Sequence, residues 1–125
     1  MPQQHQAQYV AQAAAIPYRI DRKTGRAEVL MIRRRDGGKW GIPKGLVDPG
    51  LNHLQAAAME ALQEAGVEGA LSERSLGNFV YDKSHGTCLV RVYAMKVAVS
   101  AALCDSLAPG HGGACRSPRR VCCIT

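Results

Sequence analysis

The sequence predicts an α/β fold in which strands pack against one helix, and three observations support that prediction. Residues Glu28–Arg33 hold an unbroken apolar centre that is typical of a strand covered on both faces. Apolar residues recur at helical spacing from about His53 to Ala65. Two β-rich runs, Asn78–Asp82 and Thr87–Lys96, follow the helix. A chain of 125 residues has room for one domain with a single core.

The first part of the chain divides into extended segments separated by turns. Tyr9–Ile20 is mostly apolar and ends before DRKTG, a cluster of residues that favours a turn. The run Glu28–Arg33 follows, and we expect it to be a central strand of the sheet. Asp36-Gly37-Gly38 marks another turn. Lys39–Ile42 then resumes an extended segment that Pro43 is expected to end.

The helix carries its own start and stop signals. Asn52 is placed as the N-cap, and Gln55 three residues later gives a variant of the capping box. Gly66 supplies the usual C-terminal stop. The apolar stripe between them consists of Leu54, Ala57, Ala58, Ala61, Leu62 and Ala65. Because most of these side chains are small, the helix is expected to lie close to the surface that it covers.

The second half of the chain predicts a hairpin and then a change of character. Lys83–Gly86 joins the two β-rich runs and is typical of a hairpin connection. Beyond Val99 the sequence is rich in glycine and proline and has no sustained periodicity. We therefore expect one domain over residues 1–100 and a tail of low order over residues 101–125.

Charge is unevenly distributed along the chain. Nine Lys and Arg residues lie between Arg19 and Lys44, whereas Asp48 to Asp82 is acidic on balance. A basic half opposite an acidic helix suits a phosphorylated ligand held through a divalent cation. The net charge of +6 by itself more often reflects solubility or loose affinity for nucleic acid.

The cysteines and the start of the chain exclude several classes of protein. Four of the five cysteines fall in the last 22 residues without a C-x-x-C pair, so we expect no zinc site. The first residues indicate neither a signal peptide nor a membrane span. We accordingly expect a cytoplasmic protein with neither a disulfide framework nor a membrane partner.

Two glutamates occupy neighbouring turns of one helix face. Glu60 and Glu64 lie opposite the alanine stripe, in the same sector as His53. An exposed pair of like charges at this spacing costs a few tenths of a kcal/mol, which a bound cation would offset. Mg²⁺ prefers carboxylate and carbonyl oxygens together with waters. The helix alone nevertheless favours a solvated face, and His53 alone favours a surface residue.

The loop before the helix changes that balance. The stretch that starts at Trp40 resembles the Nudix hydrolase family, whose signature is G, five residues, E, seven residues, R-E-U-x-E-E-x-G-U, with U a bulky aliphatic. This signature aligns with residues 45–67 without an insertion or a deletion. The positions that match are Gly45, Glu60, Glu64, Gly66 and Val67. The resemblance extends from about Gln8 to Val99. It implies an α/β/α sandwich around a mixed sheet.

The resemblance also implies a chemistry for this loop and helix. Members of the family bind Mg²⁺ or Mn²⁺ here and cleave a diphosphate bond, which makes Glu60 and Glu64 the expected catalytic residues. The implied metal ligands are Glu60, Gln63, Glu64 and the backbone carbonyl of Lys44. GNFVYDKSHGTCLVRVYAMKV looks like the branch that hydrolyses diphosphoinositol polyphosphates and diadenosine polyphosphates. The expected substrate is therefore a nucleoside diphosphate derivative, a dinucleoside polyphosphate or a diphosphoinositol.

Three positions depart from the signature. Leu51 and Met59 replace a glutamate and an arginine that support the loop and helix in the family, and an apolar pair can replace a charge pair at little cost. Gln63 stands where the family has a glutamate ligand, so it keeps an oxygen but removes a negative charge. Metal affinity and activity are expected to fall. The alternatives are a non-catalytic module that binds phosphorylated ligands and an inactive truncated product.

Basic residues before the helix are the expected phosphate ligands. We nominate Arg33, Arg35 and the Lys44 side chain, with Gly45 beside them, for binding the substrate. Arg34 belongs to the same run, and at least one of the three arginines should point to solvent because alternate strand residues face opposite ways. A P-loop is excluded because no G-K-[ST] follows at the required spacing. Nucleic acid is disfavoured as a partner because no stacking platform is visible, and a homodimer is left open.

The tail departs most from the family pattern. After the strand that matches Val90–Val99, Nudix domains normally add another strand and a closing helix, and we expect both to be missing here. The abrupt change of composition suggests the hypothesis that the tail is a frameshifted ending. The coding DNA would test that hypothesis directly.

Overall fold

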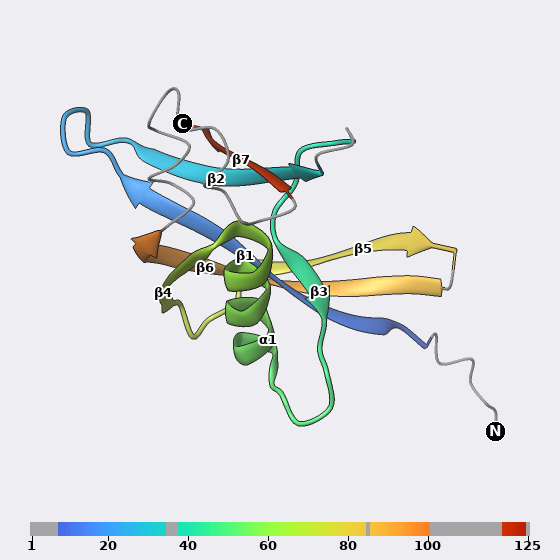
Figure 1. Ribbon diagram of the computed structural model, residues 1–125. Coiled ribbons are helices and arrows are strands. Elements are labelled where there is room, and N and C mark those ends of the chain that lie inside the picture. Colours follow the sequence, from blue (N-terminus) through green and yellow to red (C-terminus); the bar gives the residue numbers. More distant parts are fainter. Residues whose placement is uncertain (1–7, 35–37, 85, 101–118, 125) are drawn as a thin grey trace, which may run out of the picture.

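The computed structural model describes residues 8–34, 38–84, 86–100 and 119–124. In Figure 1 a helix lies against a sheet whose strands diverge at both ends. The described elements follow in the order β1 (Val10–Ile20), β2 (Ala27–Arg34), β3 (Lys44–Leu46), α1 (His53–Glu60), the π-helical turn η1 (Ala61–Ala65), β4 (Val67–Leu71), β5 (Gly77–Lys83), β6 (Gly86–Ser100) and β7 (Arg119–Ile124).

The sheet is mixed and is built on a long parallel pair, β1 and β6. Each of these two strands changes its outer neighbour along its length. β1 pairs with β3 through residues 12–14 and with β2 through residues 18–20, antiparallel in both cases. β6 pairs with β5 in its first half and with β4 in its second half. The fork places β3 and β5 at the same end of the sheet (Figure 1).

Small side chains hold the helix against the sheet. Ala13 and Ala15 of β1 are fully buried, as are Ala57 and Ala61 of the helical segment. Without larger side chains between them, the two backbones can approach closely, as the alanine stripe predicted. A second buried cluster that contains Ala14, Cys88 and Val90 belongs to the other face of the sheet, because successive strand residues point to opposite faces.

The ends of the helix confirm the predicted signals. The side chain of Asn52 accepts a hydrogen bond from the backbone N–H of Gln55, and the side chain of Gln55 accepts one from Asn52. Gly66 ends the segment in the left-handed region with φ 69°. The predicted helix from His53 to Ala65 is therefore confirmed in extent, although its last five residues are π-helical.

Several strand predictions need correction. The extended segment expected at Lys39–Ile42 forms only an isolated antiparallel bridge, between Gly41 and Ile32. The regular strand begins after Pro43 at Lys44–Leu46, where the N–H of Ala15 in β1 donates to the Pro43 carbonyl at 3.1 Å. The predicted central strand Glu28–Arg33 is β2, which has neighbours on both sides but is not the middle of the sheet. β4 is a strand that the sequence did not predict.

The expectation that no strand follows β6 is wrong. Residues Arg119–Ile124 form β7, which pairs antiparallel with β2. The rest of the predicted low-order tail, residues 101–118 and 125, lies outside the described residues. None of the helices among the described residues has the length and hydropathy that a membrane crossing requires.

Candidate functional site

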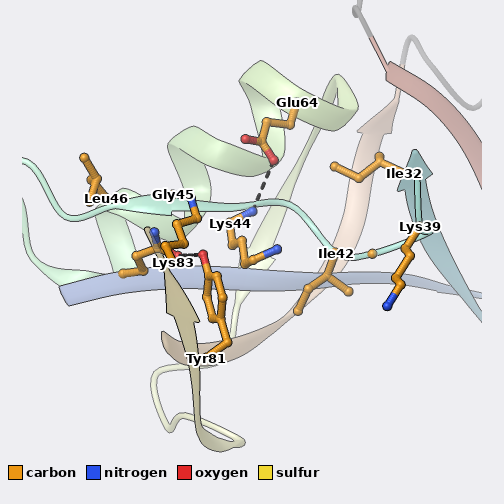
Figure 2. Close-up of a pocket in the computed structure, with 11 residues that line it drawn as sticks. Ile32, Lys39, Ile42, Lys44, Gly45, Leu46, Glu64, Tyr81 and Lys83 are labelled. Atoms are coloured by element: carbon orange, nitrogen blue, oxygen red, sulfur yellow. Dashed lines mark hydrogen bonds between the residues drawn. The ribbon is translucent and has the colours of Figure 1, made fainter. Parts of the chain in front are cut away.

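Glu64 fastens the helix to the loop strand β3. Its carboxylate oxygen Oε1 accepts a hydrogen bond from the backbone N–H of Lys44 at 3.2 Å, and the two residues are 20 positions apart. Figure 2 shows this bond bridging the helix and β3 above the pocket described below. Glu64 lies within η1, and π-helical turns occur often at functional sites. One of the two predicted catalytic carboxylates is therefore held at the predicted loop.

Glu60 meets the same strand one residue further along. A Cβ atom added to Gly45 would overlap the carboxylate carbon of Glu60 and both of its oxygens. The glycine is needed here because it leaves room for a carboxylate to lie directly against the backbone. Glu60 and Glu64 thus converge on two successive residues of β3, as the gapped signature predicted.

The carboxylate oxygens of Glu60 and Glu64 are suitable ligands for a divalent cation that also binds the phosphates of a substrate. Among the described residues, no group of three or more His, Cys, Asp and Glu side chains is arranged to bind a metal ion. Mg²⁺ is often bound through only one or two carboxylates together with substrate phosphates and waters. The carboxylates of Glu60 and Glu64 meet that requirement in number, and Gln63 is exposed on the adjoining helical turn.

A basic pocket of about 340 Å³ opens beside the carboxylates. The ammonium of Lys44 lies 5.4 Å and that of Lys83 5.7 Å from the centre of the Tyr81 ring. The Tyr81 hydroxyl donates a hydrogen bond to Gln12 at 2.8 Å, which holds the ring beside the two lysines. Figure 2 shows the residues that line the pocket: Gln12, Ile32, Lys39, Gly41, Ile42, Lys44, Gly45, Leu46, Glu64, Tyr81 and Lys83.

The basic pocket and the two carboxylates form one site that has a positively charged part and a negatively charged part. Lys44 and Lys83 come from β3 and β5, which the forked sheet brings to the same end. Their ammonium groups attract phosphate oxygens, whereas Glu60 and Glu64 attract a cation that phosphates also bind. The arrangement can therefore hold a phosphate chain between lysines and a divalent ion.

The predicted phosphate ligands divide into two groups. Lys44 and Gly45 line the pocket. Arg33 does not, and its guanidinium instead lies 5.0 Å from the centre of the Trp40 ring. Its Nε atom is buried, and within the described part of the chain it has no hydrogen-bond partner. Arg35 lies outside the described residues, and of Arg34 the structure describes only the backbone.

Sequence reasoning missed several residues of the pocket. Tyr81 and Lys83 were assigned only to a β-rich run and its turn, although their spacing of two places both on one face of a strand. Gln12 is 3% exposed and gave no signal because a glutamine in an apolar segment has no motif of its own. These residues reach the site only through the pairing of β5, β6 and β1.

The remaining departures from the signature have separate surroundings. Leu51 and Met59, which replace the charge pair, line a second, largely apolar hollow that also includes Leu62. Burial lowers the pKa of His53, and the positive charge of Arg91 lowers it further. His53 does not line the basic pocket, and its side chain is partly buried.

Comparisons with known proteins agree on one family. The family model described as NUDIX domain matches residues 10–110. A Bacillus subtilis (strain 168) protein provisionally named an 8-oxo-dGTP diphosphatase is 40% identical over 47 residues, which are 38% of this chain and 32% of that protein. Nudix hydrolase 12, mitochondrial, from Arabidopsis thaliana is 31% identical across 68% of this chain and 51% of that protein. This chain therefore spans between about a third and a half of these two relatives.

Solved structures show the same fold. A crystal structure of C. elegans Ap4A hydrolase superposes with a TM-score of 0.63 and 27% sequence identity. The match covers 72% of this chain and 69% of that chain. The two proteins thus share a fold over the matched residues.

Proposed function

This chain belongs to the Nudix family, and on that premise we propose that it is a metal-dependent pyrophosphohydrolase that cleaves a diphosphate bond in a nucleotide or polyphosphate. The observation that carries the proposal is the convergence of Glu60 and Glu64 on Lys44 and Gly45. A carboxylate pair alone is common on helix surfaces. Here the two carboxylates contact β3 at Lys44 and Gly45, which also line the basic pocket. A cation held by the carboxylates would therefore lie next to phosphates bound in the pocket.

Each part of the site has a separate task in this proposal. Lys44 and Lys83 bind and orient the phosphate chain beside Tyr81. Glu60 and Glu64 supply the oxygens that hold Mg²⁺ or Mn²⁺. When bound there, the ion neutralises the diphosphate and lowers the pKa of a water molecule. The bond from the Lys44 N–H to Glu64 keeps the phosphate-binding strand and the metal-binding helix in register.

Gln63 is proposed to weaken this activity. An amide oxygen can coordinate a metal ion but brings no negative charge, so the affinity for Mg²⁺ should be lower than with a third carboxylate. We expect Gln63→Glu to raise phosphate release at limiting Mg²⁺, and the gain should shrink as the metal is brought to saturation. The same activity with both residues at every metal concentration would remove Gln63 from the metal site.

The direct test is a substrate panel with Mg²⁺ and Mn²⁺. It contains dinucleoside polyphosphates, nucleoside diphosphate sugars, oxidised nucleotides and diphosphoinositols, because relatives are named for 8-oxo-dGTP and Ap4A. At least one class should be hydrolysed, and Glu64→Gln should abolish that hydrolysis. Activity that survives in Glu64→Gln would overturn the assignment of the site.

A binding module is the second candidate. It is favoured by one observation, that Gln63 brings no negative charge to the position where the family signature has a further glutamate. Such a module would bind the same phosphorylated ligands in the basic pocket without releasing phosphate, and Lys44→Ala would weaken that binding. Calorimetry beside the phosphate assay separates the two candidates. A cytoplasmic location and a homodimer remain part of the proposal, and cell fractionation and light scattering test them.

A further inference from the structure

Gln12 is a polar residue in an otherwise apolar part of the sheet. It is 3% exposed, and among the described residues it is the one buried residue with a polar side chain. On β1 it shares a face with Ala14, which packs with Val90 on the side of the sheet away from the helix. Its partner in the parallel ladder is Val90 itself. An apolar side chain would suit these surroundings without the desolvation cost that a buried amide carries.

Only the oxygen of this amide has a partner in the described part of the chain. Oε1 accepts a hydrogen bond from the Tyr81 hydroxyl at 2.8 Å. The amide nitrogen carries two N–H donors, and no described residue accepts from either of them. The bond to Tyr81 also sets the orientation of the amide, because Oε1 faces the hydroxyl and Nε2 therefore points away from it.

The amide nitrogen is accessible from the basic pocket. Gln12 lines that pocket together with Lys44 and Tyr81. In the part of the chain that the structure describes, the one fully buried side-chain nitrogen or oxygen without a partner is Nε of Arg33. Nε2 of Gln12 therefore keeps some exposure, and the pocket is where Gln12 meets open space. Donors in buried surroundings are seldom left without an acceptor, so these two indicate a ligand that accepts there.

The neighbouring groups indicate what kind of acceptor this is. The ammonium groups of Lys44 and Lys83 lie 5.4 Å and 5.7 Å from the centre of the Tyr81 ring, whose hydroxyl is bonded to Gln12. Figure 2 shows Lys44, Tyr81 and Lys83 gathered on one side of the pocket. Ammonium groups and the amide nitrogen can only donate. An ionised phosphate oxygen, which can only accept, matches them in both hydrogen bonding and charge.

We propose that Gln12 is a further substrate-binding residue, and that its amide nitrogen donates a hydrogen bond to an oxygen of the phosphate held by Lys44 and Lys83. The inference rests on the proposed function, because it adds an uncharged contact to the same pocket. The lysines attract a phosphate with little directional preference, since each is a point charge on a flexible chain. The amide, oriented by Tyr81, specifies the position of one phosphate oxygen.

A purely structural role makes a different prediction. In that case Gln12 only anchors the Tyr81 ring, and water meets the two amide donors. Loss of the Tyr81 hydroxyl and loss of the Gln12 amide would then weaken phosphate binding equally, because both break the same bond.

The test titrates inorganic pyrophosphate calorimetrically into the full chain without divalent metal. Gln12→Met removes the amide and keeps an unbranched side chain that suits the apolar cluster. Gln8→Met is the matched control, since it makes the same change at an exposed position outside the pocket. Tyr81→Phe, alone and combined with Gln12→Met, separates the contact made by the amide from its hold on the ring. Lys83→Met gives the reference for a contact that depends on charge.

The expected loss is specific to the amide. Gln12→Met weakens pyrophosphate binding about tenfold, as for one hydrogen bond to a charged group, whereas Gln8→Met leaves it unchanged. Tyr81→Phe weakens it less than Gln12→Met does, and adding Gln12→Met to Tyr81→Phe weakens it further. At higher salt the loss in Gln12→Met keeps its size, because the amide is neutral, whereas the loss in Lys83→Met shrinks.

A measurement on the wild type does not depend on the folding of any variant. In NMR spectra, pyrophosphate should shift the side-chain amide signals of Gln12 and leave those of Gln8 in place. The inference is overturned by unchanged amide signals of Gln12, by unchanged affinity in Gln12→Met, or by wild type that binds no pyrophosphate. It is equally overturned if Tyr81→Phe alone loses as much affinity as Gln12→Met and the combined variant loses no more. Absence of hydrolysis in wild type would instead contradict the proposed function, because these measurements contain no metal and require no turnover.

Discussion

Replacement of Gly45 by alanine should separate the stability of this protein from its activity. The new Cβ would overlap the Glu60 carboxylate, although non-bonded carbons normally stay about 3.5–4.0 Å apart. Glu60 can move aside because only the end of its side chain is in the way, at about 0.5–1.5 kcal/mol for a strained rotamer. The loss of glycine lowers the conformational entropy of the unfolded chain, which stabilises the folded protein by about 0.4–1 kcal/mol. These two terms are of similar size and opposite sign, and any contact that Glu60 loses on moving adds to the cost.

Activity should respond much more strongly than stability. Displacement of Glu60 takes one of two carboxylates from the proposed metal site, and changes that disturb metal-ligand geometry typically cost 10–100-fold in affinity or activity. We therefore expect Gly45→Ala to lower Mg²⁺-dependent phosphate release by about 10–100-fold. The melting temperature should shift by no more than a few degrees, since ~1 kcal/mol corresponds to about 4 °C in a domain of this size.

Gly41 supplies the matched control. It lines the same pocket, and a Cβ added there would have no neighbour within 4 Å. Gly41→Ala should leave both the melting temperature and phosphate release close to wild type. Full activity in Gly45→Ala would show that the position of the Glu60 carboxylate is irrelevant to the reaction. Equal losses in the two variants would point to the loop as a whole.

Three further substitutions test the fold around the site. Gly69→Ala should destabilise the protein by about 1–3 kcal/mol in urea unfolding, because its Cβ would strike the backbone carbonyl of Lys96, which cannot swing aside; an unchanged midpoint would contradict the pairing of β4 with β6. Tyr81→Phe should cost about 1–3 kcal/mol, because the nearly buried Gln12 loses its donor; a stable variant would mean that water replaces the hydroxyl. Asn52→Ala should cost about 1 kcal/mol through the lost N-cap, whereas Asn52→Asp should restore it.

The difference between Gly45 and Gly69 illustrates what the sequence could reveal about single residues. Gly45 was identified because the gapped signature assigns a glycine to its position. Gly69 had no such signal. A side chain is excluded there by the backbone of Lys96, a residue 27 positions away on β6. A glycine's role can be predicted when a motif records it, but its partner across the sheet is set by strand pairing.

The sequence by itself determined the features that depend on neighbours along the chain. The helix, its Asn52 cap, its Gly66 stop and the hairpin of β5 and β6 all arise from hydrogen bonds and packing between residues close in sequence. The signature from Gly45 to Glu64 could be recognised for the same reason, because it also lies within one short segment. Short segments carry these interactions in their own composition.

Tertiary structure decided where the separate segments meet. The parallel pairing of β1 with β6 joins residues about 80 positions apart. Together with the pairing of β5 on β6 and of β3 on β1, it brings Gln12 to Tyr81 and places Lys44 and Lys83 beside the Tyr81 ring. The register of β7 on β2 is equally non-local. No local pattern encodes such contacts, because the energy that favours them is burial and backbone pairing summed over the whole sheet.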